Sequence, residues 1–161
     1  MILVLLGTQQ NDFSRLLKEI DILIKENVIK EEVIAQVGST KYKTENIKQF
    51  TLIDKEQIDK LKKQANYIIT HGGVGSIVSS LKLNKKIIAV PRLKEYNEHV
   101  NDHQIQIVQN FSKNGYIIGV LEIKKLKYAV EKIETFVPKK YISNTENMIK
   151  LIETYIDDVK K

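Results

Sequence analysis

One loop of this sequence combines residue types and spacing that suit the binding of a phosphate. It consists of His71, Gly72, Gly73, Val74, Gly75 and Ser76. An apolar run ends directly before the loop, and a short apolar helix is predicted after it. Glycines allow a tight turn and a close approach of the backbone to a ligand. The first N–H groups of a helix have no partner within it and lie at its positive end. This order therefore predicts a phosphate or diphosphate site, with Ser76 as a cap or a hydrogen-bond donor.

Two other phosphate-binding motifs do not fit this loop. The P-loop ends in Gly-Lys-Ser/Thr, and no such triplet follows Gly75. The dinucleotide fingerprint needs a small residue where Val78 stands, and an acidic residue at the end of the next strand, which is absent. A tight turn without a ligand is the alternative, although three glycines in four residues exceed what a turn needs.

Several polar residues near the loop have two interpretations. Asn101 and Gln104 have the spacing of a capping box, so Gln104 either caps a helix or contacts a ligand. His71 either orients the loop through a backbone hydrogen bond or contacts the phosphate. His99 and His103 have a helical spacing that can hold a metal, but no His-Glu-x-x-His pattern accompanies them, so we predict no metal site. A Gly-x-Ser-x-Gly nucleophile elbow is also absent.

Strand-like and helix-like segments alternate along the chain and would position this loop. Apolar runs predict strands at 2–6, 33–37, 47–52, 67–70, 86–90 and 116–120. Periodic stripes and caps predict helices after Asp12, after Asp54 with Gln57, and at 77–83, 102–113, 122–136 and 143–159. The last is a C-terminal amphipathic helix with a Ser143–Glu146 capping box. The alternation predicts an α/β fold with a doubly wound parallel sheet, Rossmann-like, whose ligands bind beyond the carboxyl ends of the strands.

Composition narrows the class of protein. The 161 residues predict one domain, 1–161, and the 42% apolar content is typical of globular proteins. The absence of cysteine excludes disulfides and fits a reducing cytoplasm. No apolar run approaches the ~18 residues of a membrane span, and residues 1–6 read as a strand and not as a signal peptide. We therefore expect a cytoplasmic protein.

The net charge of +6 comes mainly from dispersed lysine, because Arg15 and Arg92 are the only arginines. Without clustered arginine or an aromatic stacking motif, we predict no nucleic-acid partner. Solvated helix faces account for dispersed lysines, and attraction to an anionic membrane or acidic partner is the alternative.

Three motifs follow one another in order: residues 70–77 around the glycine loop, 90–92 (Val-Pro-Arg) and 98–104 (Glu-His-Val-Asn-Asp-His-Gln). They resemble the C-terminal domain of glycosyltransferase family 28. The opening Leu-Gly-Thr at 6–8, with Phe13 and Arg15, extends the resemblance nearly end to end. Its strongest form is to the short PssE-type capsular and exopolysaccharide glycosyltransferases. The donor-binding subunit of the two-part UDP-GlcNAc transferase of the dolichol pathway is similar.

This resemblance implies the C-terminal half of a GT-B glycosyltransferase, which binds the nucleotide sugar. It implies that the diphosphate lies on the loop from Gly73 to Ser76, in agreement with the helix-dipole argument. The other contacts that it implies are Leu52 and Ile53 with uracil, His103 and Gln104 with the donor sugar, and Gly7 and Thr8 at the cleft facing a partner domain.

The sequence departs from the family at the ribose. Many relatives carry a carboxylate on the helix after the glycine loop, where Ser79 stands here. A hydroxyl is an uncharged and weaker partner for the ribose hydroxyls. Glu98, expected at the cleft, is the candidate for the missing carboxylate.

The resemblance implies the catalytic, donor-binding subunit of a UDP-sugar-dependent glycosyltransferase. Its donor would be UDP-galactose or UDP-N-acetylglucosamine, and its acceptor a lipid-linked saccharide in polysaccharide biosynthesis. The alternatives are a non-catalytic nucleotide-binding or interaction subunit of the same fold, which Ser79 favours, and a nucleotide-binding regulator.

Sugar transfer with inversion needs a general base, and this sequence offers no clear one. We therefore expect the base on a membrane-anchored, acceptor-binding partner subunit, which would hold this chain at the inner face of the membrane. Neither a cofactor nor a metal is expected, since the helix start can stabilise the departing diphosphate. The helix at 143–159 is the expected docking element, unless it packs on its own sheet.

Overall fold

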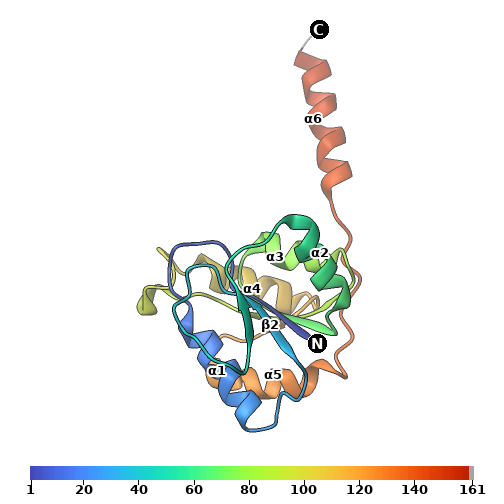
Figure 1. Ribbon diagram of the computed structural model, residues 1–161. Helices are drawn as coiled ribbons and strands as arrows, with labels where there is room; N and C mark the ends of the chain where they lie inside the picture. The colour runs from blue at the N-terminus through green and yellow to red at the C-terminus, as the bar shows by residue number, and fades with distance from the viewer. Residues whose placement is uncertain (160–161) are drawn as a thin grey trace.

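Six parallel strands form one sheet in the computed structural model (Figure 1), in the order β3-β2-β1-β4-β5-β6. They are β1 (Ile2–Leu5), β2 (Val33–Gln36), β3 (Lys48–Phe50), β4 (Tyr67–His71), β5 (Lys86–Val90) and β6 (Ile118–Gly119). The structure describes residues 1–159, without the side chains of 145–148 and 157–159. The predicted doubly wound parallel sheet is confirmed. Strand order reverses between β1 and β4, which places a crevice for ligands at their carboxyl ends.

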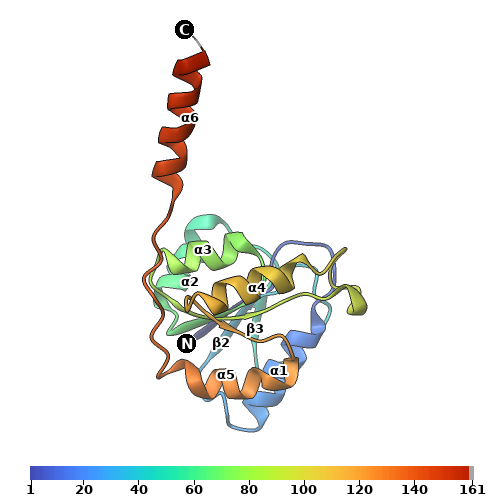
Figure 2. The same ribbon diagram turned by 180° about the vertical axis from the view of Figure 1, so that it is seen from behind.

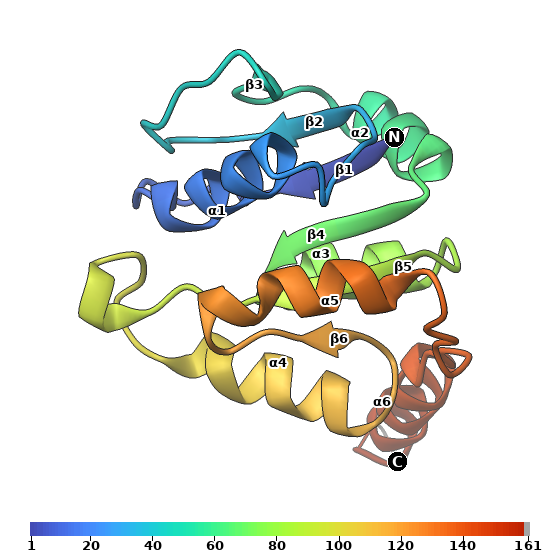
Figure 3. The same ribbon diagram turned by 90° about the horizontal axis from the view of Figure 1, so that it is seen from below.

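Helices cover both faces of this sheet (Figure 3). They are α1 (Ser14–Lys25), α2 (Lys55–Gln64), α3 (Val74–Leu81), α4 (His103–Lys113) and α5 (Leu126–Ile133). Alternate residues of β1 explain the two layers. Ile2 and Val4 belong to the core cluster shared with α1 and α5, whereas Leu3 and Leu5 pack with α2. Because both faces are buried, the strands read as continuous apolar runs in the sequence.

Two elements differ from the predicted ones in ways that bear on the site. Asp12 is not the cap of α1: its carboxylate accepts hydrogen bonds from the Ser14 hydroxyl and the Lys41 N–H, and Phe13 holds the N-cap position. Asp12 therefore connects two loops and does not cap the N-terminus of α1. The helix after the glycine loop begins at Val74 and not at residue 77, so the loop itself forms its first turn.

The structure also shortens two predicted elements near the C-terminus. The strand predicted at 116–120 is reduced to two residues, because β6 lies at the sheet edge and pairs only with β5. The helix predicted at 122–136 divides into a 3-10 turn, η2 (Ile123–Lys125), and α5. A second 3-10 turn, η1 (Lys94–Tyr96), interrupts the loop after β5.

The C-terminal helix α6 (Thr145–Val159) extends away from the sheet and its covering helices (Figures 1 and 2). The predicted apolar stripe of this helix consists of Met148, Ile149, Ile152, Tyr155, Ile156 and Val159. Of these, Ile149, Ile152, Tyr155 and Ile156 are 43–69% exposed. The alternative that this stripe packs on its own sheet is therefore wrong. Met148 and Val159 of the stripe, and Glu146 of the predicted cap, lie outside the described side chains. Among the described residues, no helix combines the length and apolarity needed to cross a membrane.

Candidate functional site

The loops after β1, β2 and β4 meet at the carboxyl edge of the sheet with almost no space between them. Gly7 has a φ of +84°, and a Cβ there would lie 2.8 Å from the His71 ring. Gly38 has a φ of +53°, and its Cβ would lie 2.5 Å from the Gly7 carbonyl oxygen. Both positions require glycine for conformation and for space. The β1 loop is thus held against the glycine loop at the switch point of the sheet.

The glycine loop leads directly into α3. Gly73 holds the N-cap position without a side-chain cap, and the first helical hydrogen bond runs from the Ile77 N–H to the Gly73 carbonyl at 3.1 Å. The N–H groups of Val74, Gly75 and Ser76 therefore have no acceptor within the helix. Within the described residues, the Ser76 hydroxyl forms no hydrogen bond. Three backbone donors and one hydroxyl at the positive end of a helix suit a phosphate group.

The three glycines of the loop differ in whether the fold leaves room for a side chain. A Cβ at Gly72 would lie 2.8 Å from the Gln104 Cβ, and one at Gly73 would lie 2.3 Å from the His71 Nε2. A Cβ at Gly75 would meet nothing within 4 Å. Packing thus explains Gly72 and Gly73, so only one of the three glycines supports the predicted ligand site. Only Gly75 leaves open space that the fold does not use.

Gln104 joins the glycine loop to the loop after β5. Its side-chain oxygen accepts hydrogen bonds from the N–H of Gly72 at 3.0 Å and from the N–H of Arg92 at 3.1 Å. The residue is 5% exposed. The capping-box interpretation is wrong, because the Asn101 side chain accepts from the His103 N–H and the Gln104 oxygen is engaged elsewhere. The amide nitrogen of Gln104 is the end that a donor sugar could contact.

We expect Gln104→Ala to lower the free energy of unfolding by about 3 kcal/mol, because two buried N–H groups lose their acceptor. Gln104→Glu keeps an acceptor oxygen and should lose much less. If the amide contacts the sugar, Gln104→Glu weakens binding of a UDP-sugar while leaving UDP affinity unchanged. Urea unfolding and calorimetric titration with both ligands measure these effects. Equal losses for UDP and the UDP-sugar in Gln104→Glu would contradict the sugar contact.

His71 ends β4 with its ring packed beside the β1 loop. Its Nδ1 lies 3.2 Å from the Leu5 carbonyl oxygen, so Nδ1 carries the proton and Nε2 carries the lone pair. The predicted backbone hydrogen bond is therefore present. Burial lowers the pKa of His71 from 6.5 to about 4, an effect that the charges of Arg92 and His99 reinforce. The ring is neutral at physiological pH.

This pKa makes the stability of the protein depend on pH. Between pH 6.5 and about 4, the unfolded state binds a proton that the folded state does not. The contribution of His71 to the free energy of unfolding is therefore complete above pH 6.5. Up to about 3 kcal/mol of this free energy is lost as the pH falls to 4. In His71→Asn, the loss of unfolding free energy between pH 7 and pH 4.5 should be smaller than in the wild type. The exposed His103→Asn serves as control. Equal acid sensitivity of the wild type and His71→Asn would count against a buried neutral ring.

The loop after β5 is fixed by both arginines of the protein, an arrangement that the sequence argument missed. Arg15 donates two hydrogen bonds to the Glu98 carboxylate, at 2.9 and 2.8 Å. The Arg92 guanidinium is fully buried, donates to the carbonyls of Leu6, Asn11 and Glu98, and lies over the Phe13 ring. One feature of the sequence could have indicated this role. The protein has only two arginines, and both lie in segments that carry the family resemblance.

Glu98 does not line the cleft as expected. It is 2% exposed, and the Leu93 N–H donates to the same carboxylate that binds Arg15. Its oxygens are thus committed to the loop, and it cannot replace the carboxylate expected at the ribose.

A pocket of about 670 Å³ lies between α2 and α3, beside the open Gly75. Ser79 lines it, but its hydroxyl donates to the Gly75 carbonyl and accepts from the Lys62 ammonium at 2.8 Å. Lys62 is buried, which lowers its pKa. An ammonium therefore stands close to the position where the family resemblance led us to expect a carboxylate. Lys62 was not predicted as a site residue. It is one of several lysines of α2, and nothing in the sequence distinguishes it from the others.

The other predicted site residues lie around these loops. Leu52 and Ile53 precede α2, whose cap is confirmed by the bond from the Gln57 N–H to Asp54. Leu52 is 59% exposed, so its side chain is accessible to the predicted uracil ring. Thr8 and His103 are exposed at the ends of the β1 and β5 loops. The side chains of His99 and Gln9 connect these two loops through a contact of 3.1 Å.

Comparisons with known proteins bear on the family and the fold of this chain. Residues 1–158 match the model of the glycosyltransferase family 28 C-terminal domain. Two curated relatives are both named UDP-N-acetylglucosamine transferase subunit ALG13. The relative from Candida albicans is 27% identical over 110 residues, which cover 68% of this chain and 32% of the relative. The relative from Candida glabrata is 32% identical over 99 residues, covering 56% and 46%.

The matches span 32% and 46% of the two relatives' own lengths. A solution NMR structure of ALG13 is similar to the whole fold, with a TM-score of 0.61, 20% identity and coverage of 93% of both chains. This similarity confirms the predicted Rossmann-like architecture.

Proposed function

Because this chain belongs to the family of the glycosyltransferase family 28 C-terminal domain, we propose that it is the catalytic, donor-binding subunit of a UDP-sugar-dependent glycosyltransferase. The donor is UDP-galactose or UDP-N-acetylglucosamine. The acceptor is a lipid-linked saccharide in polysaccharide biosynthesis, such as that of a capsule. The name of the two Candida relatives, UDP-N-acetylglucosamine transferase subunit, supports a nucleotide-sugar donor and a second subunit.

The single observation that carries this proposal is the start of α3. The N–H groups of Val74, Gly75 and Ser76 have no acceptor within the helix, and the space at Gly75 is open. A diphosphate placed there accepts these hydrogen bonds and lies at the positive end of the helix dipole. The same donors stabilise the negative charge that grows on UDP as the sugar leaves. Transfer on this route requires neither a cofactor nor a metal.

The rest of the donor extends to either side of the diphosphate. Uracil lies against Leu52 and Ile53, and the ribose lies near Ser79 in the pocket between α2 and α3. On the other side, the sugar lies near His103 and the amide nitrogen of Gln104. The buried Gln104 oxygen supports this placement, because it holds both flanking loops in position.

The acceptor side of the reaction belongs to a partner. The acceptor hydroxyl must lose a proton to a general base, and the partner subunit supplies that base. The partner is membrane-anchored, binds the acceptor, and holds this chain at the inner face of the membrane through α6. The exposed apolar residues of α6 support such a docking role.

A non-catalytic nucleotide-binding subunit is the second candidate. The Lys62–Ser79 hydrogen bond favours it, because an ammonium and not a carboxylate contacts Ser79, and the carboxylate of Asp59 in the same pocket lies 3.8 Å from that ammonium. Turnover separates the two: a catalytic subunit transfers sugar when the partner is present, whereas a non-catalytic one binds UDP without transfer.

Calorimetric titration of the purified chain with UDP, UMP and uridine tests the donor site. We expect UDP to bind about tenfold or more tightly than UMP, because the second phosphate adds charge-assisted hydrogen bonds to α3. ADP serves as the control for base recognition near Leu52. If UDP does not bind, or binds no better than uridine, the donor-binding proposal fails.

A further inference from the structure

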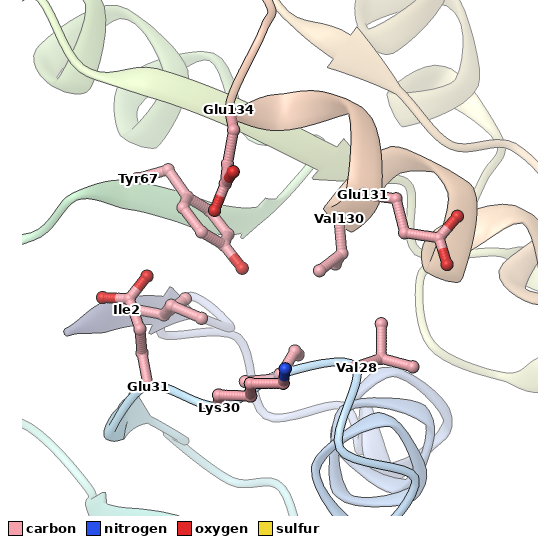
Figure 4. A pocket seen from close by; sticks show the side chains of 9 residues that line it. Ile2, Val28, Lys30, Glu31, Tyr67, Val130, Glu131 and Glu134 are labelled. Carbon is pink, nitrogen blue, oxygen red and sulfur yellow. The ribbon is translucent and has the colours of Figure 1, made fainter.

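A second pocket lies at the amino edge of the sheet, where β1 and β4 begin, and therefore away from the glycine loop (Figure 4). Its volume is about 310 Å³. Ile2, Val28 and Val130 form its apolar wall. They come from β1, from the turn after α1 and from α5, so the pocket is built by segments distant in sequence. The proposed transferase reaction makes no use of it.

The hydroxyl of Tyr67 points into this pocket (Figure 4). Tyr67 is 7% exposed, and its hydroxyl forms no hydrogen bond with any residue that the structure describes. The Tyr67 hydroxyl oxygen is not one of the fully enclosed polar atoms, so solvent or an occupant of the pocket can pair with it. Burial, then the charges of Glu31 and Glu134, raises the pKa of Tyr67, so the phenol stays neutral. Its oxygen can therefore accept a hydrogen bond from an occupant.

Carboxylates outnumber ammonium groups around the pocket. Glu31, Glu131 and Glu134 line it together with one lysine, Lys30. Glu31 is neutralised by the terminal ammonium of Met1 at 2.7 Å. Within the described residues, the carboxylates of Glu131 and Glu134 form no ion pair.

A neighbouring lysine adds a positive charge beside the pocket. Lys86 lies close to the pocket, but its ammonium donates to the backbone carbonyls of Ile133 and Glu134. Among the described residues, Glu131 and Glu134 thus remain without an ion pair, with Lys30 in the lining and the Lys86 ammonium close by.

The shape of the pocket favours an organic cation over a metal ion. In the described part of the chain, no three acidic, histidine or cysteine side chains converge as metal ligands do. The pocket instead combines an apolar wall with the Tyr67 hydroxyl and the side chain of Glu134, whereas the Glu131 carboxylate points away from Tyr67 (Figure 4). A cation with an aliphatic stem matches both parts, since its stem contacts the wall while its head reaches the polar groups.

We propose that this pocket binds an alkylammonium or guanidinium group on a short aliphatic stem. The stem packs on Ile2, Val28 and Val130. The head donates hydrogen bonds to the Tyr67 oxygen and to the Glu134 carboxylate, with Glu131 at the rim. Lysine and arginine side chains of another protein share this chemistry with free polyamines. The proposal is independent of the donor site at the opposite edge of the sheet.

Titration of the isotope-labelled chain with n-butylammonium tests the site, with the backbone amide shifts of Lys30, Glu31 and Tyr67 as the readout. The neutral n-butanol has the same stem and should shift these amides far less. Tyr67→Phe and Glu134→Gln should each weaken butylammonium binding by about tenfold, because each removes one charge-assisted acceptor. Tyr128→Phe, at an exposed tyrosine of α5, is the matched control and should bind as the wild type does.

Two further measurements make the result decisive. Tyr67→Phe should keep its thermal stability and its affinity for UDP, because the lost hydroxyl has no partner among the residues that the structure describes. Equal binding of butanol and butylammonium, or unchanged binding in both pocket variants, would overturn the proposal. Nα-acetyl-lysine methylamide and spermidine distinguish the source: tighter binding of the first indicates a protein side chain, and of the second a free polyamine.

Discussion

Gly75→Val abolishes the binding of UDP to a protein that still folds. The physical reason is that the space next to Gly75 is empty in the fold, since an added Cβ meets nothing within 4 Å. The valine side chain then occupies the place of the diphosphate and shields the N–H groups of α3 from it. We expect UDP affinity to fall by at least a hundredfold, which corresponds to about 3 kcal/mol. Calorimetry measures the affinity, and urea unfolding measures the fold.

Matched variants separate this effect from a general disturbance of the loop. Gly75→Ala should weaken UDP binding less than Gly75→Val does. It should not destabilise the protein, because alanine has a higher helix propensity than glycine. Ser76→Ala removes one hydroxyl and should cost about tenfold or less in UDP affinity. Gly72→Ala should instead destabilise the fold, because its Cβ would press on Gln104. If folded Gly75→Val binds UDP as the wild type does, the diphosphate does not lie at this helix start.

Deletion of residues 143–161 leaves a folded domain that neither binds its partner nor transfers sugar. The described side chains of α6 are exposed, so their removal takes little from the core. Docking of an apolar helix face into a partner groove is a common binding mode. We therefore expect the melting temperature to change little, while capture of the partner and sugar transfer are lost. Co-purification and turnover on a lipid-linked acceptor measure the two losses.

Point variants on α6 give a sharper form of this test. Ile152→Lys places a charge on the exposed apolar side, and it should lower partner affinity by about thirtyfold if Ile152 is a central contact. Lys150→Ala is the control on a charged residue of the same helix. Full turnover by the purified chain alone would defeat the two-subunit proposal. Unfolding of the truncated chain would show instead that α6 belongs to the core.

The secondary structure near the site was largely predictable because its signals are local. A strand covered on both faces is a continuous apolar run, and a glycine turn before a helix is visible within a few residues. The boundaries were less predictable. β6 is short because it lies at a sheet edge, and α3 starts three residues early because Gly73 already has the conformation of an N-cap. Neither cause is visible in a sequence window.

The roles of individual polar residues were the least predictable part of the site. Gln104 matched a capping box by spacing, yet its oxygen binds the N–H of Gly72, 32 positions away. Glu98 was assigned to the cleft, yet it pairs with Arg15, 83 positions away. Ser79 was expected to contact the ribose, yet its hydroxyl accepts a hydrogen bond from Lys62 of a neighbouring helix. In each case the hydrogen-bond partner is a residue distant in sequence that the tertiary fold places nearby.

The sequence by itself therefore determined the alternation of strands and helices, the parallel sheet, and a glycine loop at the start of a helix. These follow from apolar periodicity and from the conformational freedom of glycine, which act over a few neighbouring residues. Only the tertiary structure decided which glycine is open to a ligand, which polar groups are already paired, and that α6 stands apart from the sheet. Those outcomes depend on contacts between distant segments, and such contacts leave no periodic pattern in a single sequence.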